Sequence, residues 1–139
     1  SLIMPFCAGT FPDTFTSKVP LIYPAKILNG LAKALSRNAN IIVITPDEEQ
    51  VQQAYDQWGP IMKKVTPIPA NPYKGLDEVR KAAELAKDIE ADLIVMDCIG
   101  YTREARKIVA TVSEKPVLLC RTTMARVVRE MIDGKLSEE

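Results

Sequence analysis

The sequence predicts a three-layer α/β/α fold around a mainly parallel β-sheet of at least four strands. Short, continuously apolar runs are typical of strands that are buried on both faces, as they are in parallel sheets. These runs alternate with longer segments whose apolar residues recur at helical spacing, which is the pattern of successive β-α-β units. Helices are therefore expected on both faces of the sheet, with right-handed crossovers.

Five apolar runs are the candidate strands. Residues 40–45 (NIIVIT) are the clearest, because every position between the two ends is β-branched and apolar. Residues 64–69 (KVTPIP) contain two prolines, which cannot donate to a central ladder, so this strand is expected at an edge. Residues 2–7 (LIMPFC) are placed at or beyond an edge, and 92–97 (DLIVMD) and 116–120 (PVLLC) complete the set.

Five segments with apolar residues at helical spacing are the candidate helices. Thr45 and Thr102 are expected as N-caps, and a proline follows Thr45 at the first helical position. The pattern predicts helices over about 24–36, 46–58, 76–90, 103–113 and 122–132.

The composition excludes several classes of protein. Lysine plus arginine (18) balance aspartate plus glutamate (18), so nucleic acid is not an expected partner. No apolar stretch approaches the ~20 residues that cross a bilayer, so no membrane association is expected. Three widely spaced cysteines favour a reducing cytoplasm over a secreted disulfide framework.

The same residue counts argue against bound cofactors. The chain has no histidine and only three cysteines, so no metal site is expected. It has neither a GxGxxG nor a Walker A pattern, so no nucleotide cofactor is expected either. A homo-oligomer stays open at this point.

The 139 residues are enough for one α/β domain with a core of its own. The chain opens directly on an apolar run, which favours a fragment lacking an N-terminal part. Residues 1–20 are therefore expected to be the remnant of a preceding half-domain, and residues 21–139 to form the core.

Two cysteines are the strongest candidates for chemistry. Cys7 and Cys98 each end an apolar run, and each is followed by a turn with glycine at the second position. The carboxyl ends of strands in open α/β sheets are where ligands bind, so the two thiols could face one cleft. Because histidine is absent, cysteine is the best-placed residue type for proton transfer. The alternative is that both are ordinary buried residues.

The helix expected after Thr102 bears on the reactivity of Cys98. A helix N-terminus stabilises a thiolate, so Cys98 is predicted to have a lowered pKa and to react before Cys120. Cys120 is more simply a structural residue at the end of the strand 116–120, although the following Arg121 and helix start could bind an anion. Strand alternation points Asp97 away from Cys98, where it is expected to cap a turn.

Small turns around both cysteines are the expected contacts for a ligand. Backbone N–H groups at Gly9 and Gly100 could hold a carboxylate. Thr45 either caps a helix or lines the ligand site, and Tyr101 is the tyrosine nearest Cys98. The candidate substrate-binding residues are Ala8, Gly9, Thr10, Thr45, Ile99, Gly100 and Tyr101.

Several segments resemble the AroM protein family. These are LIMPFCAGTFP, VPLIYPAKILNGLAKAL, NIIVITPDEEQ, ADLIVMDCIGYTREARKIV and KPVLLCRTTMARVVREM, which together cover nearly the whole chain. The resemblance is to the later part of a typical AroM protein. It implies an α/β fold and brings no established reaction with it.

AroM proteins resemble, more remotely, the aspartate/glutamate/hydantoin racemase superfamily. That resemblance implies one half of a two-domain architecture. It also implies that Cys7 and Cys98 would abstract and return an α-proton on opposite faces of a substrate, without metal or cofactor. The superfamily follows its cysteines with Asn-Thr and with Thr, whereas this chain has Ala8-Gly9 and Ile99.

Two functional hypotheses follow. The first is a cofactor-independent racemase or isomerase of a small carboxylate that uses Cys7 and Cys98. The second is a non-catalytic module on the same fold that binds a small ligand or regulates another process.

Overall fold

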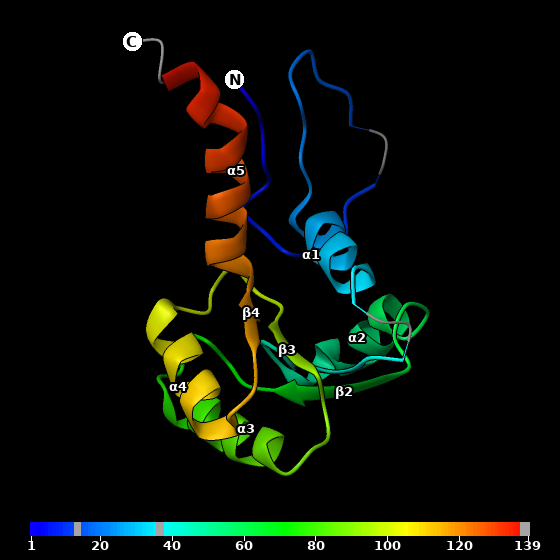
Figure 1. Cartoon of the computed structure of the whole chain (residues 1–139), viewed down its shortest axis with the longest axis vertical. Helices are drawn as coiled ribbons and strands as arrows, with labels where there is room; N and C mark the ends of the chain where they lie inside the picture. The colour runs from blue at the N-terminus through cyan, green and yellow to red at the C-terminus, as the bar shows by residue number, and fades with distance from the viewer. Residues whose placement is uncertain (13–14, 36–37, 137–139) are drawn as a thin grey trace.

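The computed structural model describes residues 1–12, 15–35 and 38–136, and it confirms the α/β fold (Figure 1). Its central sheet has four strands within the described part of the chain, and all neighbouring strands are parallel. The strand order is β2-β1-β3-β4, so β2 is at an edge, as its prolines predict. The strands are β1 (Asn40–Thr45), β2 (Lys64–Pro69), β3 (Leu93–Met96) and β4 (Val117–Leu119).

Helices cover both faces of this sheet and make the three predicted layers. One face packs on α1 (Pro24–Lys33), α2 (Val51–Trp58) and the first turns of α5 (Cys120–Leu136), and a short 3-10 turn, η1 (Glu48–Gln50), precedes α2. The other face packs on α3 (Asp77–Lys87) and α4 (Arg103–Ser113). Alternate residues of β1 point into the two clusters, since Ile41 and Val43 belong to the first and Ile42 and Ile44 to the second.

The helix α5 continues well past the sheet, and the N-terminal segment runs beside it (Figure 1). Met124 contributes to the core under α1, whereas Met131 near the far end is largely exposed. None of the helices in the described ranges is long and apolar enough to cross a membrane.

Residues 2–7 are not a strand, contrary to the prediction. Only Ile3 pairs, through one isolated parallel bridge to Leu21. Pro5 has no N–H to extend that bridge, and Phe6 is 74% exposed. An apolar run therefore gives no strand here, because it lies against no neighbouring edge of the sheet.

Several predicted boundaries are also wrong. Thr45 still belongs to β1 and is not an N-cap. Asp47 caps η1, which leads into α2, and its carboxylate accepts from the Gln50 N–H at 3.0 Å. Cys120 is the first residue of α5 and does not end a strand. The helix α1 ends at Lys33, and Ser36 lies outside the described residues. Thr102 does cap α4, since its hydroxyl accepts from the Ala105 N–H at 3.1 Å.

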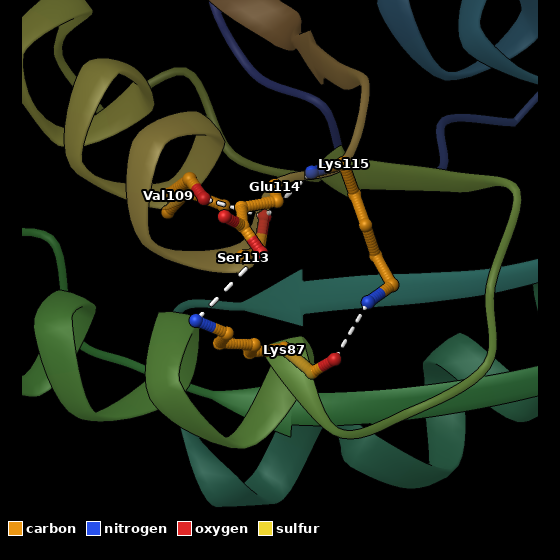
Figure 2. Close-up of polar contacts among 5 residues, drawn as sticks. All are labelled: Lys87, Val109, Ser113, Glu114 and Lys115. Carbon is orange, nitrogen blue, oxygen red and sulfur yellow. Dashed lines mark hydrogen bonds and ion pairs between the residues drawn. The ribbon is translucent and has the colours of Figure 1, made fainter.

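The end of α3 is tied to the turn between α4 and β4 (Figure 2). The Lys115 ammonium donates to the Lys87 carbonyl at 2.9 Å, and Lys87 lies 3.7 Å from the Glu114 carboxylate. The Ser113 hydroxyl donates to the Val109 carbonyl at 2.6 Å and accepts from the Lys115 N–H at 3.3 Å. These contacts fix the chain reversal that leads into β4.

Glu114→Gly is expected to stabilise the protein by about 0.5–1 kcal/mol, because Glu114 is held in the left-handed region (φ 58°) that glycine occupies without steric cost. The substitution also removes the ion pair between Glu114 and Lys87, but this pair is exposed and contributes little to stability. Urea unfolding should show the gain, with Glu104→Gly in the first turn of α4 as a destabilising control. A lower midpoint for Glu114→Gly would contradict the expectation.

Candidate functional site

The topology makes the ends of β1 and β3 the expected place for a ligand site. From β1 the chain passes through α2 to β2 on one side, and from β3 it passes through α4 to β4 on the other. The two connections therefore diverge on opposite faces of the sheet and leave a crevice at their carboxyl ends. Thr45 ends β1, and Asp97 and Cys98 follow β3 directly.

A cavity of about 260 Å³ lies at this crevice. Pockets for drug-sized ligands have volumes of about 300 Å³ or more, so this cavity suits a smaller molecule. The N-terminal segment and α2 complete its walls, with Ala8 anchored in the core of the first face. The cavity is lined by Cys7, Ala8, Gly9, Thr45, Pro46, Gln50, Gln53, Ala54, Gln57, Asp97 and Cys98.

Both candidate cysteines line this cavity, and their turns have the same local geometry. The Cys7 sulfur accepts a hydrogen bond from the Gly9 N–H at 3.3 Å. The Cys98 sulfur accepts one from the Gly100 N–H, also at 3.3 Å. The glycine N–H groups expected to hold a ligand carboxylate are therefore directed at sulfur instead. At Cys98 the Gly100 N–H favours the thiolate.

Asp97 lines the same cavity, although the sequence predicted that it would point away from Cys98. The alternation itself holds: Asp97 meets α2 on one face, whereas Cys98 packs against the cluster on the other. Both nevertheless reach the cavity, because it lies beyond the end of β3, where the crevice opens to both faces.

The carboxylate of Asp97 is poorly compensated. The Trp58 indole N–H donates to Oδ2 at 3.2 Å, while Oδ1 is buried without a hydrogen-bond partner among the described residues. Burial raises the pKa of Asp97 to about 6, and the bond from Trp58 offsets only part of this rise. A buried carboxylate with one unpaired oxygen in a cavity wall is a typical property of functional sites.

The comparison with known families agrees with the sequence resemblance. The family model described as AroM protein matches residues 1–132. The chain belongs to the AroM family. The search of curated proteins and the search of solved structures both found no match.

The thiol of Cys98 in this AroM-family chain does not have the lowered pKa that the sequence predicted. Burial raises its pKa above the ordinary 9.0, the Gly100 N–H lowers it, and Asp97 and Cys7 raise it.

Cys120 lies outside the cavity and is fully buried in the core between the sheet and α5. Burial raises the pKa of its thiol to about 12. The neighbouring Arg121, suggested as part of an anion site, has its guanidinium directed at the backbone. It donates to the carbonyls of Ile99 at 2.9 Å and Gly100 at 3.3 Å, and so it braces the turn after Cys98.

The remaining predicted ligand contacts divide into two groups. Ala8, Gly9 and Thr45 line the cavity, whereas Thr10 lies beside it and accepts from the Gln53 side chain at 3.4 Å. The other three, Ile99, Gly100 and Tyr101, are buried behind Cys98 and do not line it.

Tyr101 has a structural role in place of the predicted ligand contact. It is fully buried, and its hydroxyl donates to the Ala70 carbonyl at 2.6 Å.

Sequence reasoning missed the wall that α2 and η1 contribute. Gln50, Gln53 and Gln57 recur at intervals of three and four residues, which places them on one helical side. Polar residues at that spacing directly after a buried strand were an available signal. Within the described ranges no group of three or more histidine, cysteine, aspartate or glutamate side chains is arranged to hold a metal ion.

The exposures of the three cysteines predict their order of alkylation. Limiting iodoacetamide at pH 7.5 is expected to label exposed Cys7 first, half-buried Cys98 second and Cys120 at least tenfold more slowly, as read by mass spectrometry of peptides. Labelling in urea should remove the differences. Labelling of Cys120 together with or before Cys98 in the native protein would contradict this structure.

Proposed function

We propose that this AroM-family chain acts as a cofactor-independent racemase or isomerase of a small carboxylate, with Cys7 and Cys98 as the two bases. The single observation that carries the proposal is that two cysteines 91 positions apart in the sequence line one small cavity. Two-base proton transfer needs an acid and a base on opposite sides of one carbon atom.

In the proposed reaction, one cysteine begins as a thiolate and the other as a thiol. The thiolate takes the proton from the α-carbon, so an S–H bond forms, the C–H bond breaks and the electron pair moves into the adjoining carboxylate as an enediolate. The other thiol then gives its proton to the opposite face of the carbon and becomes a thiolate. The proton count and the oxidation state are unchanged, so no co-reactant is needed.

The electrostatics of the cavity support this division of roles. The negative charges of Asp97 and Cys7 both raise the pKa of Cys98, which disfavours two thiolates at the same time. The Gly100 N–H and Arg121 act in the opposite direction and favour the thiolate of Cys98. A site of this kind holds one thiolate more readily than two. The reduced thiols that it requires fit the proposed cytoplasmic location.

The glycine N–H groups are engaged with sulfur, so they are not the proposed contacts of the substrate. The hydroxyl of Thr45 and the amide groups of Gln50, Gln53 and Gln57 line the cavity and are the proposed hydrogen-bonding groups for the ligand. They take the place of the Asn and Thr residues that follow the cysteines in the racemase superfamily.

Solvent deuterium exchange tests the proposal. The protein is incubated in D₂O with a panel of small amino acids and hydroxy acids, and the α-carbon is followed by NMR. The proposal expects exchange of at least one panel member, and expects that exchange to be lost when Cys7 and Cys98 are both replaced by serine. Binding of a panel member without any α-exchange would favour a binding module and overturn the enzymatic proposal.

A further inference from the structure

The cavity wall is acidic and carries no counter-charge. Asp97, Cys7 and Cys98 are its ionisable groups, and no lysine or arginine is among the described residues that line it. The neighbouring Arg121 is directed to the carbonyls of Ile99 and Gly100, behind the turn. Its charge acts on Cys98 from there, but a ligand that enters the cavity meets Asp97 with no cation on the wall to pair with it.

The carboxylate of Asp97 contributes a negative charge to the wall that does not depend on which cysteine is a thiolate. Trp58 donates to one carboxylate oxygen, and the other oxygen is buried with no partner from the described residues. An indole N–H is a neutral donor, so it orients the carboxylate without neutralising it. Because the site is partly desolvated, the field of this charge is screened less than it would be at the surface.

The other polar groups on the wall are neutral. The amide nitrogens of Gln50, Gln53 and Gln57 already donate to Asp47, Thr10 and Asn29, at 3.1, 3.4 and 3.3 Å. Amide groups fixed in this way can accept from a ligand's N–H or O–H group through their oxygens. They do not supply the positive charge that a second ligand carboxylate would need.

We propose that Asp97 makes this cavity selective for a small ligand without net negative charge, namely an α-amino acid zwitterion with an uncharged side chain, and makes it reject dicarboxylates. The ammonium group of such a ligand offsets the negative wall, and its single carboxylate adds no net charge. A dicarboxylate brings an additional unit of negative charge into the same space and is repelled. The inference rests on the proposed site and names its substrate class.

Binding measurements with defined probes test this selectivity. L-alanine and L-serine are compared with L-aspartate and L-glutamate by isothermal titration at pH 7.5, using the intact chain. The neutral amino acids are expected to bind at least tenfold more tightly. Asp97→Asn is expected to narrow that preference to less than threefold, because the amide keeps an acceptor for Trp58 but removes the charge.

Asp56→Asn is the matched control, since Asp56 is exposed on α2 and lies outside the cavity wall. It should leave the preference unchanged. Dicarboxylates that bind the wild-type protein as tightly as alanine or serine, or a panel of which no member binds, would overturn the inference. An unchanged preference in Asp97→Asn, with a native circular dichroism spectrum, would also overturn it.

Binding and deuterium exchange together distinguish a failure of the proposed selectivity from a failure of the proposed racemase activity. Tight binding of alanine or serine without α-deuterium exchange would contradict the racemase and support the selectivity. Exchange of aspartate or glutamate with no exchange of neutral amino acids would support the enzyme and contradict the selectivity.

Discussion

Asp97→Asn is expected to stabilise the folded protein by up to about 3 kcal/mol at pH 7. The pKa of Asp97 rises from 3.8 to about 6 on folding. At about 1.36 kcal/mol per pKa unit, the buried carboxylate therefore opposes folding by about 3 kcal/mol once it is ionised. Asparagine has nearly the same shape, and its carbonyl oxygen can still accept from the Trp58 indole.

The sign of the pH dependence follows from the raised pKa. Below pH 3.8 the carboxyl is protonated in both the folded and unfolded states, so it adds no penalty. Between about pH 4 and pH 6 the unfolded state releases its proton first, and the Asp97 contribution to stability falls as the pH rises. Above pH 6 both states are ionised, and the penalty is constant.

Urea unfolding of the wild-type protein and of Asp97→Asn at several pH values between 4 and 8 measures this penalty. The difference between the two proteins should grow from pH 4 to pH 6 and then level off. Asp56→Asn on the exposed side of α2 should show no such growth. A variant that is less stable than the wild-type protein at pH 7 would show that the charge of Asp97 is compensated and would contradict the account.

Cys98→Ser is expected to lower the rate of enantiomer interconversion at least hundredfold, within the range for loss of a general acid or base. A serine hydroxyl is a much weaker acid than a thiol, so it can neither form the base nor release its proton at neutral pH. The fold should persist, because serine is similar in size and can accept the Gly100 N–H that now binds sulfur. Chiral chromatography of the reaction mixture measures the change.

Cys120→Ala is the control for this experiment, because Cys120 is buried in the core and lies outside the cavity. It should retain interconversion with only a modest loss of stability. If Cys98→Ser keeps the wild-type rate, or if both variants lose activity equally, Cys98 is not one of the two bases.

Most of the sheet could be predicted because β1, β3 and β4 are continuous apolar runs between clear turn residues, and the prolines of β2 indicate an edge strand. The same reasoning brought Thr45 and Cys98 to one place, since the carboxyl ends of parallel strands share one edge of a sheet. Cys7 also lines the cavity, but it does not end a strand. The reasoning failed at residues 2–7, where the apolar run was correct but no sheet edge lies beside it. Pairing partners are a tertiary property that a local pattern does not contain.

The role of Asp97 could not be predicted for a similar reason. Strand alternation gives the face of a residue within the strand, and it placed Asp97 correctly on the face opposite to Cys98. It does not indicate that Trp58, 39 positions earlier, reaches across from α2 to hold the carboxylate in the cavity wall. The glycine turns were likewise predicted as turns, but their N–H groups are directed at the cysteine sulfurs.

The arrangement of two thiols on one cavity is tested most directly by α-deuterium exchange with each separate enantiomer in the Cys7→Ser and Cys98→Ser variants. If the thiols act on opposite faces, each variant keeps one base and exchanges only the enantiomer whose α-hydrogen faces it, with retention of configuration. The two variants are expected to show opposite preferences. The same preference in both variants, or exchange of both enantiomers by either one, would contradict this expectation.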